Sequence, residues 1–156
     1  MLESVDYDRR FESACKTAQA MYQEHGHAVP VILAFKGGDM IGACDLRPVM
    51  DKREIAAKVM AEHMRETGTD AYVFISEAWS AKVTKDEMET DTVPKVMPRD
   101  RPDRVEVLYV QMETKDFSRA RSYGISKGQV LGVWDDIDSR KQEGVNMGGI
   151  WSGLLK

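Results

Sequence analysis

The chain has 156 residues, of which 42% are hydrophobic and 31% are charged, and its net charge is −4. This balance is that of a globular domain with its own core, and it excludes a disordered or fibrous protein. The excess of 26 acidic over 22 basic residues argues against non-specific nucleic-acid binding, which requires a basic surface, so we expect no nucleic-acid partner.

The sequence contains no apolar stretch approaching the roughly 18 residues that a membrane helix requires, and residues 1–6 carry charges where a signal peptide is apolar. The two cysteines, Cys15 and Cys44, lie too far apart for a C-x-x-C pair, and two thiols are typical of a reducing compartment. A disulfide between them stays open at this point. We expect a cytoplasmic protein without membrane contact.

The first two predicted elements are a helix and a hairpin. Apolar residues at three- and four-residue spacings predict a helix over residues 7–25, which ends at Gly26. Residues 29–45 then predict a hairpin, because the Gly37-Gly38 pair supplies the positive φ angles of a tight turn.

A second helix is predicted over residues 51–66. Asp51 and Glu54 have the spacing of a capping box, which satisfies free backbone N–H groups at a helix start. An apolar stripe follows and predicts the buried face; it consists of Ile55, Val59, Met60, His63 and Met64.

The remaining strands are predicted from β-branched and aromatic runs. They span residues 71–79, 104–113, 117–125 and 129–134, and the last three form a meander. Between the first two lies a long loop, residues 82–103, with three prolines and many charges. A loop of this length inside a domain usually has a function or is disordered.

The C-terminal residues 135–156 are predicted to form an arm. The arm is charged, then glycine-rich, and ends with Ile150, Trp151, Leu154 and Leu155. These four apolar side chains can dock either on this chain or on a partner.

Together these elements predict an α+β fold in a single domain of residues 1–156. We expect one mainly antiparallel sheet of five to six strands, with two helices packed on a face, in the order α-β-β-α-β-β-β-β.

The candidate chemical site consists of two carboxylates at strand ends. If the second helix is a crossover, the strands ending near Asp45 and Glu77 run parallel, and both ends share one edge of the sheet. Glu77 lies on an otherwise apolar strand face and needs a partner, such as Arg47, Arg104 or a metal. A structural salt bridge or a solvated strand end is the simpler interpretation.

Other chemistry has less support in the sequence. His25 and His27 alternate and can ligate a metal only with further ligands, and no H-E-x-x-H motif is present, so we expect no metal and no cofactor. No nucleophile elbow or phosphate-binding loop occurs. Cys15, on the apolar face of the first helix, is expected to be buried and inert.

Several arginines form a basic cluster, which we interpret as a solvated loop because aspartates interrupt it. Its members are Arg99, Arg101, Arg104, Arg119 and Arg121.

Two stretches in the middle third of the chain carry a resemblance. Phe74-Ile75-Ser76-Glu77-Ala78-Trp79, followed after a loop by Pro102-Asp103-Arg104-Val105-Glu106-Val107, resembles a pattern in a family of bacterial and phage proteins with no assigned activity. The resemblance brings no catalytic residues with it. It makes Glu77, Trp79, Arg104 and Glu106 the expected ligand or partner contacts.

Three functional hypotheses follow. The leading one is a small non-enzymatic binding or assembly domain that self-associates or contacts a protein partner. The alternative is a metal- or acid/base-dependent hydrolase of a phosphorylated or nucleotide ligand, with Asp45 and Glu77 as its carboxylates. The third, implied by the resemblance, is a phage-encoded inhibitor of a host protein that acts through residues 82–103.

Overall fold

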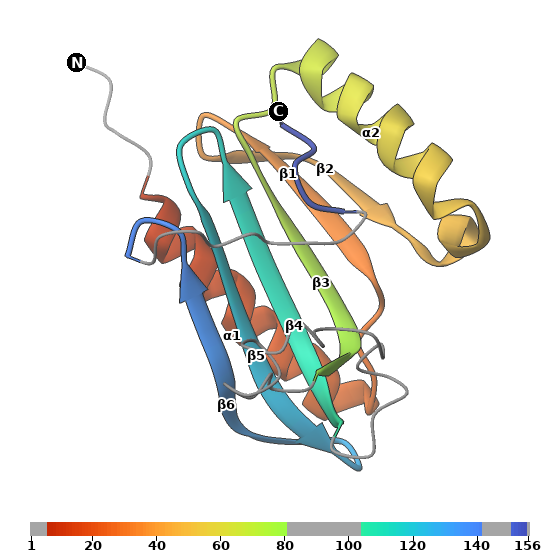
Figure 1. The fold of residues 1–156 in the computed structure, drawn as a ribbon, viewed down its shortest axis with the longest axis vertical. Coiled ribbons are helices and arrows are strands. Elements are labelled where there is room, and N and C mark those ends of the chain that lie inside the picture. The colour runs from red at the N-terminus through yellow and green to blue at the C-terminus, as the bar shows by residue number, and fades with distance from the viewer. Residues whose placement is uncertain (1–5, 81–103, 142–150, 156) are drawn as a thin grey trace, which may run out of the picture.

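The structure, a computed structural model, describes residues 6–80, 104–141 and 151–155 (Figure 1). The predicted loop 82–103 and Ile150 therefore lie outside the described residues. The elements are α1 (Tyr7–His25), β1 (Val31–Lys36), β2 (Asp39–Asp45), the 3₁₀ helix η1 (Arg47–Lys52), α2 (Arg53–Thr67), β3 (Ala71–Ser80), β4 (Val105–Thr114), β5 (Ser118–Ser126) and β6 (Gln129–Asp138). Neither α1 nor α2 is long and apolar enough to span a bilayer.

The six strands form one sheet in the order β2-β1-β3-β4-β5-β6, and every neighbouring pair is antiparallel. The predicted fold class and element order are confirmed. β1 lies between β2 and β3 and is antiparallel to both. Strands β2 and β3 therefore run in the same direction without pairing with each other. Among the described strands, β2 and β6 are the two edges of the sheet.

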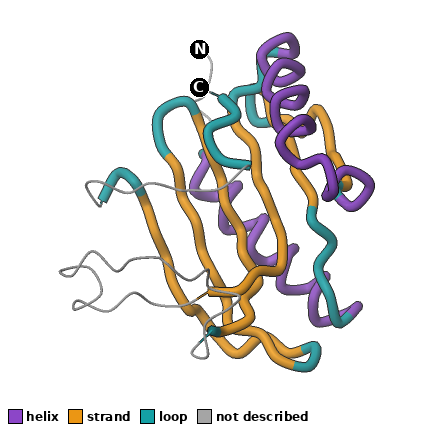
Figure 2. Tube along the Cα trace, turned by 45° about the vertical axis from the view of Figure 1, so that its right-hand side comes forward, coloured by secondary structure: helices purple, strands orange, loops and turns teal. Residues whose placement is uncertain are grey.

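The two helices cover opposite faces of the sheet, which corrects the expectation that both pack on one face. α1 runs behind the strands in Figures 1 and 2, whereas α2 lies on the other face beside β1 and β2. The reason is visible in β3, where Tyr72 and Val73 are both fully buried although neighbouring strand residues point to opposite faces. Each face therefore needs a cover of its own.

The core under α1 is the larger of the two. Its helical side chains include Phe11, Cys15 and Tyr22, which pack on alternate residues of the central strands. Asp6 begins the helix by accepting a hydrogen bond from the backbone N–H of Arg9 at 3.0 Å. Gly26, with φ of 76°, ends it.

Helix α2 begins later than the sequence indicates, and the predicted capping box is wrong. Asp51 lies inside η1, where Pro48 occupies the first turn. The chain therefore already turns before α2 starts at Arg53, and Lys52 precedes it without a side-chain capping bond.

The core under α2 is completed by the C-terminal segment 151–155. Trp151 and Leu154 are each only 6% exposed and pack with residues of α2, β1 and β3. The backbone N–H of Gly153 donates to the carboxylate of Glu113 at 2.7 Å. The sequence left open whether the C-terminal apolar residues dock on this chain or on a partner. The described part, residues 151–155, docks on this chain. The expected arm also begins later than residue 135, because β6 continues to Asp138.

Candidate functional site

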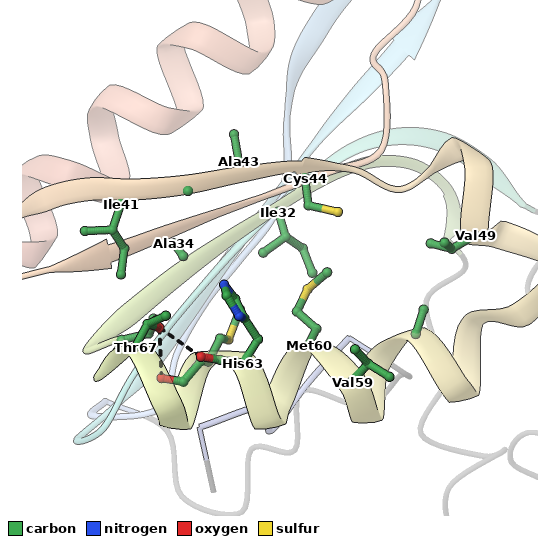
Figure 3. A pocket seen from close by; sticks show the side chains of 14 residues that line it. Ile32, Ala34, Ile41, Ala43, Cys44, Val49, Val59, Met60, His63 and Thr67 are labelled. Atoms are coloured by element: carbon green, nitrogen blue, oxygen red, sulfur yellow. Dashed lines mark hydrogen bonds between the residues drawn. The ribbon is translucent and has the colours of Figure 1, made fainter.

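A groove of about 530 Å³, with a mainly apolar lining, lies between α2 and the strands β1 and β2 and is called here the α2 groove. Figure 3 views it from close by, with side chains of the helix facing those of the two strands. Its lining includes Ile32, Ala34, Ile41, Cys44, Val59 and Met60.

A β-bulge in β2 shapes the groove. Ala34 pairs with Gly42 and Phe35 pairs with Met40, so Ile41 is an extra residue without a partner on β1. Regular alternation would send Ile41 and Cys44 to opposite faces, but in Figure 3 both point toward α2 while Ala43 points away. The bulge therefore adds a large apolar side chain to the groove.

The rim of the groove exposes apolar side chains to solvent. Ile41 on β2 lines the groove and is 45% exposed, whereas Met40, 58% exposed, pairs with Phe35 of the α1 core and lies on the other face. Ile55 and Val59, one turn apart on α2, are 66% and 60% exposed. The sequence predicted these two α2 residues on the buried stripe, and that prediction is wrong, because only the Ala57 and Met64 side of the helix reaches the core.

Two polar side chains of the groove, Thr67 and Cys44, have hydrogen-bond partners in the fold, and the His63 ring also lines it (Figure 3). The Thr67 hydroxyl contacts the backbone oxygen of His63 and the Thr69 hydroxyl, each at 2.9 Å. The Cys44 thiol donates to the Asp45 backbone oxygen at 3.7 Å. Most of the lining is apolar, so the groove is suited to apolar contact.

The two predicted carboxylates lie outside the α2 groove, and each has a partner of its own. Asp45 accepts hydrogen bonds from Arg47, the shortest at 2.6 Å, and these bonds lower the pKa of the exposed Asp45 carboxyl. Glu77 accepts a hydrogen bond from the backbone N–H of Ala28 at 3.1 Å. The strands that carry them run in the same direction, as expected for a crossover, with β1 between them.

Trp79, Arg104 and Glu106 lie together at the far end of the sheet. Trp79 is the cross-strand neighbour of Glu106, and the Arg104 guanidinium lies 4.8 Å from the centre of the Trp79 ring. Trp79 also borders a smaller depression of about 300 Å³ that includes Tyr109. Burial raises the pKa of Tyr109 to about 12, so its hydroxyl stays protonated.

The two histidines weighed as metal ligands do not gather with others in the described part of the chain. His25 and His27 are exposed, with ring centres 6.3 Å apart. Within that part, no three side chains of histidine, cysteine, aspartate or glutamate come close enough to hold an ion.

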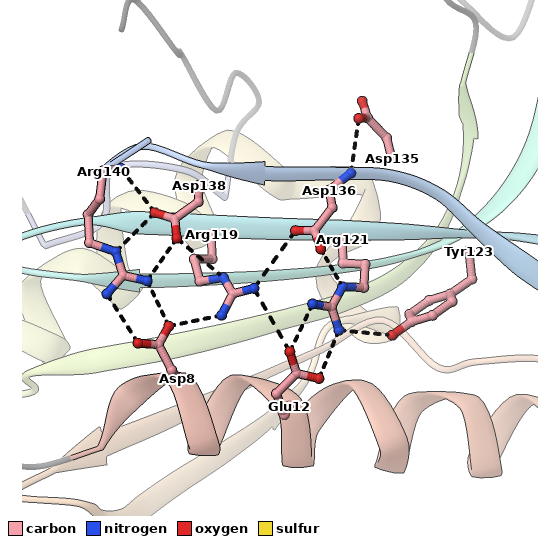
Figure 4. Close-up of polar contacts among 9 residues, drawn as sticks. All are labelled: Asp8, Glu12, Arg119, Arg121, Tyr123, Asp135, Asp136, Asp138 and Arg140. Carbon is pink, nitrogen blue, oxygen red and sulfur yellow. Dashed lines mark hydrogen bonds and ion pairs between the residues drawn. The ribbon is translucent and has the colours of Figure 1, made fainter. Parts of the chain in front are cut away.

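Two arginines of the predicted basic cluster are not solvated, and their side chains are only 12% and 13% exposed (Figure 4). Arg119 pairs with Asp8 at 2.9 Å, and Arg121 pairs with Glu12 at 2.8 Å. They are largely covered because both lie on the strand face that α1 packs against, with their guanidinium groups over the Phe11 ring. Arg99 and Arg101 lie outside the described residues.

The same network ties β6 to α1. Arg140 joins Asp8 at 2.7 Å and Asp138 at 2.8 Å. Hydrogen bonds from Arg140 hold the pKa of Asp138 down at about 2. The arginine charges are thus neutralised within the fold, and we assign this network to stability.

Residues 3–129 match the model of the family described as Bacteriophage lambda protein ea47. The chain belongs to this family. The ea47 match runs from α1 into β6, so the resemblance extends well beyond the middle third on which it was first noticed. No curated protein sequence and no solved structure matches the chain.

The resemblance seen in the sequence had already indicated a family of bacterial and phage proteins. It also named Trp79, Arg104 and Glu106 as one group of expected contacts. It missed the α2 groove. No local signal was available, because Ile55 and Val59 fit an apolar helical stripe although they lie on roughly the opposite side of α2 from the buried Ala57 and Met64.

Proposed function

We propose that this ea47-family protein is a non-enzymatic binding domain that takes an extended protein strand at the β2 edge, beneath α2. The observation that carries the proposal is the coincidence of three features: a sheet edge, an apolar groove beside it, and exposed apolar residues along both.

The physical basis is strand addition. An edge strand presents backbone N–H and C=O groups that an incoming strand can pair with, while alternate side chains of that strand enter a neighbouring groove. Among the described strands, β2 is such an edge, and five of its seven residues, 40–44, carry no charge. Ile41 and Val59 then contact the side chains of the bound strand.

Binding is favoured over catalysis by where the reactive side chains lie. The Asp45 carboxylate is held by Arg47 and the Glu77 carboxylate by Ala28, and neither lines the α2 groove, so the groove presents no carboxylate to a bound ligand. The α2 groove itself offers apolar surface, which gives affinity without activating a bond.

We also propose that the protein binds its partner in the cytoplasm. Cys15 and Cys44 are both free thiols, as expected for a reducing compartment.

The proposal can be tested by selecting peptides from a random library on the immobilised full-length protein. Selected peptides should be extended and apolar at alternate positions, and their dissociation constants can be measured by fluorescence anisotropy. Val59→Glu places a charge in the groove and should weaken binding by at least about tenfold, since a buried unpaired charge is costly.

Leu131→Glu is the matched control. Leu131 lies on β6, the other sheet edge, and is 66% exposed, close to the 60% of Val59. This variant should bind the peptides as the wild type does. The proposal is wrong if no peptide is enriched, or if Val59→Glu leaves the affinity of the enriched peptides unchanged while circular dichroism shows both variants folded.

A further inference from the structure

We infer that the strand bound at this edge is β2 of a second copy of the chain, paired antiparallel about a twofold axis perpendicular to the sheet. This inference rests on the proposed function and names the partner.

The first argument is that β2 is itself the kind of strand that the groove selects. It is extended, uncharged from Met40 to Cys44, and exposed along nearly its whole length. Natural edge strands are commonly protected from such pairing by charged side chains placed mid-strand. β2 has its charges only at its ends, at Asp39 and Asp45.

The second argument concerns the outer face of α2. A twofold axis perpendicular to the sheet keeps each face of the sheet on the same side, so the two α2 helices lie on one face, next to the joined β2 strands. Ile55 and Val59 of each copy are then covered by the other helix. A single added peptide strand would occupy the groove but leave Ile55, which is 66% exposed, in water.

The third argument is electrostatic. In an antiparallel pair, the Asp39 end of one β2 meets the Asp45 end of the other. Arg47 already neutralises Asp45 through a contact of 2.6 Å, so Asp39 meets a neutral pair rather than a second bare carboxylate. In a parallel pair, Asp39 would face its own copy, which is repulsive.

The other sheet edge favours a closed dimer over an open chain of copies. Pairing of β2 with β6 of the next molecule would continue without end. β6 carries Asp135, Asp136 and Asp138 in its C-terminal half, whereas β2 has charges only at its two ends. Carboxylates placed within the strand discourage strand addition at that edge.

The test begins with sedimentation equilibrium of the full-length protein and of two single variants. The wild type should be a dimer, and Val59→Glu should raise the dimer dissociation constant by at least about tenfold, whereas Leu131→Glu should leave it unchanged. A wild type that stays monomeric throughout a dilution series overturns the inference. If the peptides selected above still bind that monomer, the proposed function stands.

Cross-linking then tests the twofold pairing itself. In a Cys44→Ser background, single cysteines are introduced at residues 41, 42 and 43 and, as a control, at Leu131. Gly42 tolerates the change, since a Cβ there meets no atom within 4 Å. A residue near the twofold axis faces its own copy, so mild oxidation should give covalent dimers at one or more β2 positions and none at Leu131. Dimers without β2 cross-links, or polymers that Leu131→Glu disperses, overturn the inference.

Discussion

The hydroxyl of Tyr72 donates a 2.7 Å hydrogen bond to the backbone oxygen of Trp151, 79 residues further along the chain. This buried contact fixes the C-terminal segment on the face of the sheet that α2 also covers. The same hydroxyl accepts a hydrogen bond of 3.4 Å from the backbone N–H of Leu154.

Tyr72→Phe should therefore destabilise the protein. The change leaves the Trp151 carbonyl without its donor in a buried site, which costs about 1–3 kcal/mol. The free energy of unfolding can be measured by urea denaturation. Tyr7→Phe is the control, because the Tyr7 hydroxyl makes no hydrogen bond among the described residues. An equally large loss of unfolding free energy in Tyr7→Phe would contradict the role given to the Tyr72 hydrogen bond.

The C-terminal segment also offers a matched pair of leucines. Leu154 is 6% exposed, whereas the neighbouring Leu155 is only partly buried. Leu154→Ala should cost about 2–5 kcal/mol of unfolding free energy, as expected for a core cavity, and Leu155→Ala should cost clearly less. Equal losses measured by thermal and urea denaturation would show that the segment is not docked as described.

The ion pairs around α1 should make stability depend on pH. The folded pKa of Asp138 is about 2, below the value of about 3.9 for a free aspartate. A lowered folded pKa contributes stability that is present above the unfolded pKa and lost as the pH falls toward the folded one. The wild type should therefore lose this contribution between about pH 4 and pH 2.

Asp138→Asn tests this dependence, with unfolding measured across the acid range. The variant should be less stable at neutral pH by about 1–3 kcal/mol, and the difference from wild type should shrink as the pH falls through that window. A constant difference for Asp138→Asn at every pH would contradict the prediction.

Much of this fold follows from local sequence, as the ends of its elements illustrate. Gly26 and the Gly37-Gly38 turn have positive φ angles, so the predicted helix end and hairpin turn are where the structure has them. Spacing of apolar residues gives each helix an apolar side. It does not say which face of the sheet that side meets, because both faces of β3 are apolar.

The candidate site was less predictable for a related reason. Glu77 and Trp79 are recognisable in the sequence because a charged residue and a large aromatic residue interrupt the apolar run near the end of the predicted strand. Ile55 and Val59 match the pattern of a buried stripe, and only the placement of α2 at the sheet edge leaves them exposed. The bulge at Ile41 could not be predicted from the sequence either, because it depends on how β2 pairs with β1.

The two thiols should differ in reactivity. Cys15 is 1% exposed, and burial raises its pKa to about 11, so it should not react with Ellman's reagent under native conditions at mildly alkaline pH. Cys44 is partly exposed at the α2 groove. One thiol per folded chain should therefore react, and Cys44→Ser should abolish that reaction whereas Cys15→Ser should not.

The double cover of β3 has a consequence for how the sequence can change. Ala71, Tyr72 and Val73 are fully buried in succession, and alternate residues belong to different cores. No position in this stretch has a solvent side on which a polar replacement is harmless, and a slip of one residue would exchange the two cores. Mutational tolerance should therefore be lowest along β3 and highest along β2, so that the surface proposed to bind is also the one most free to evolve.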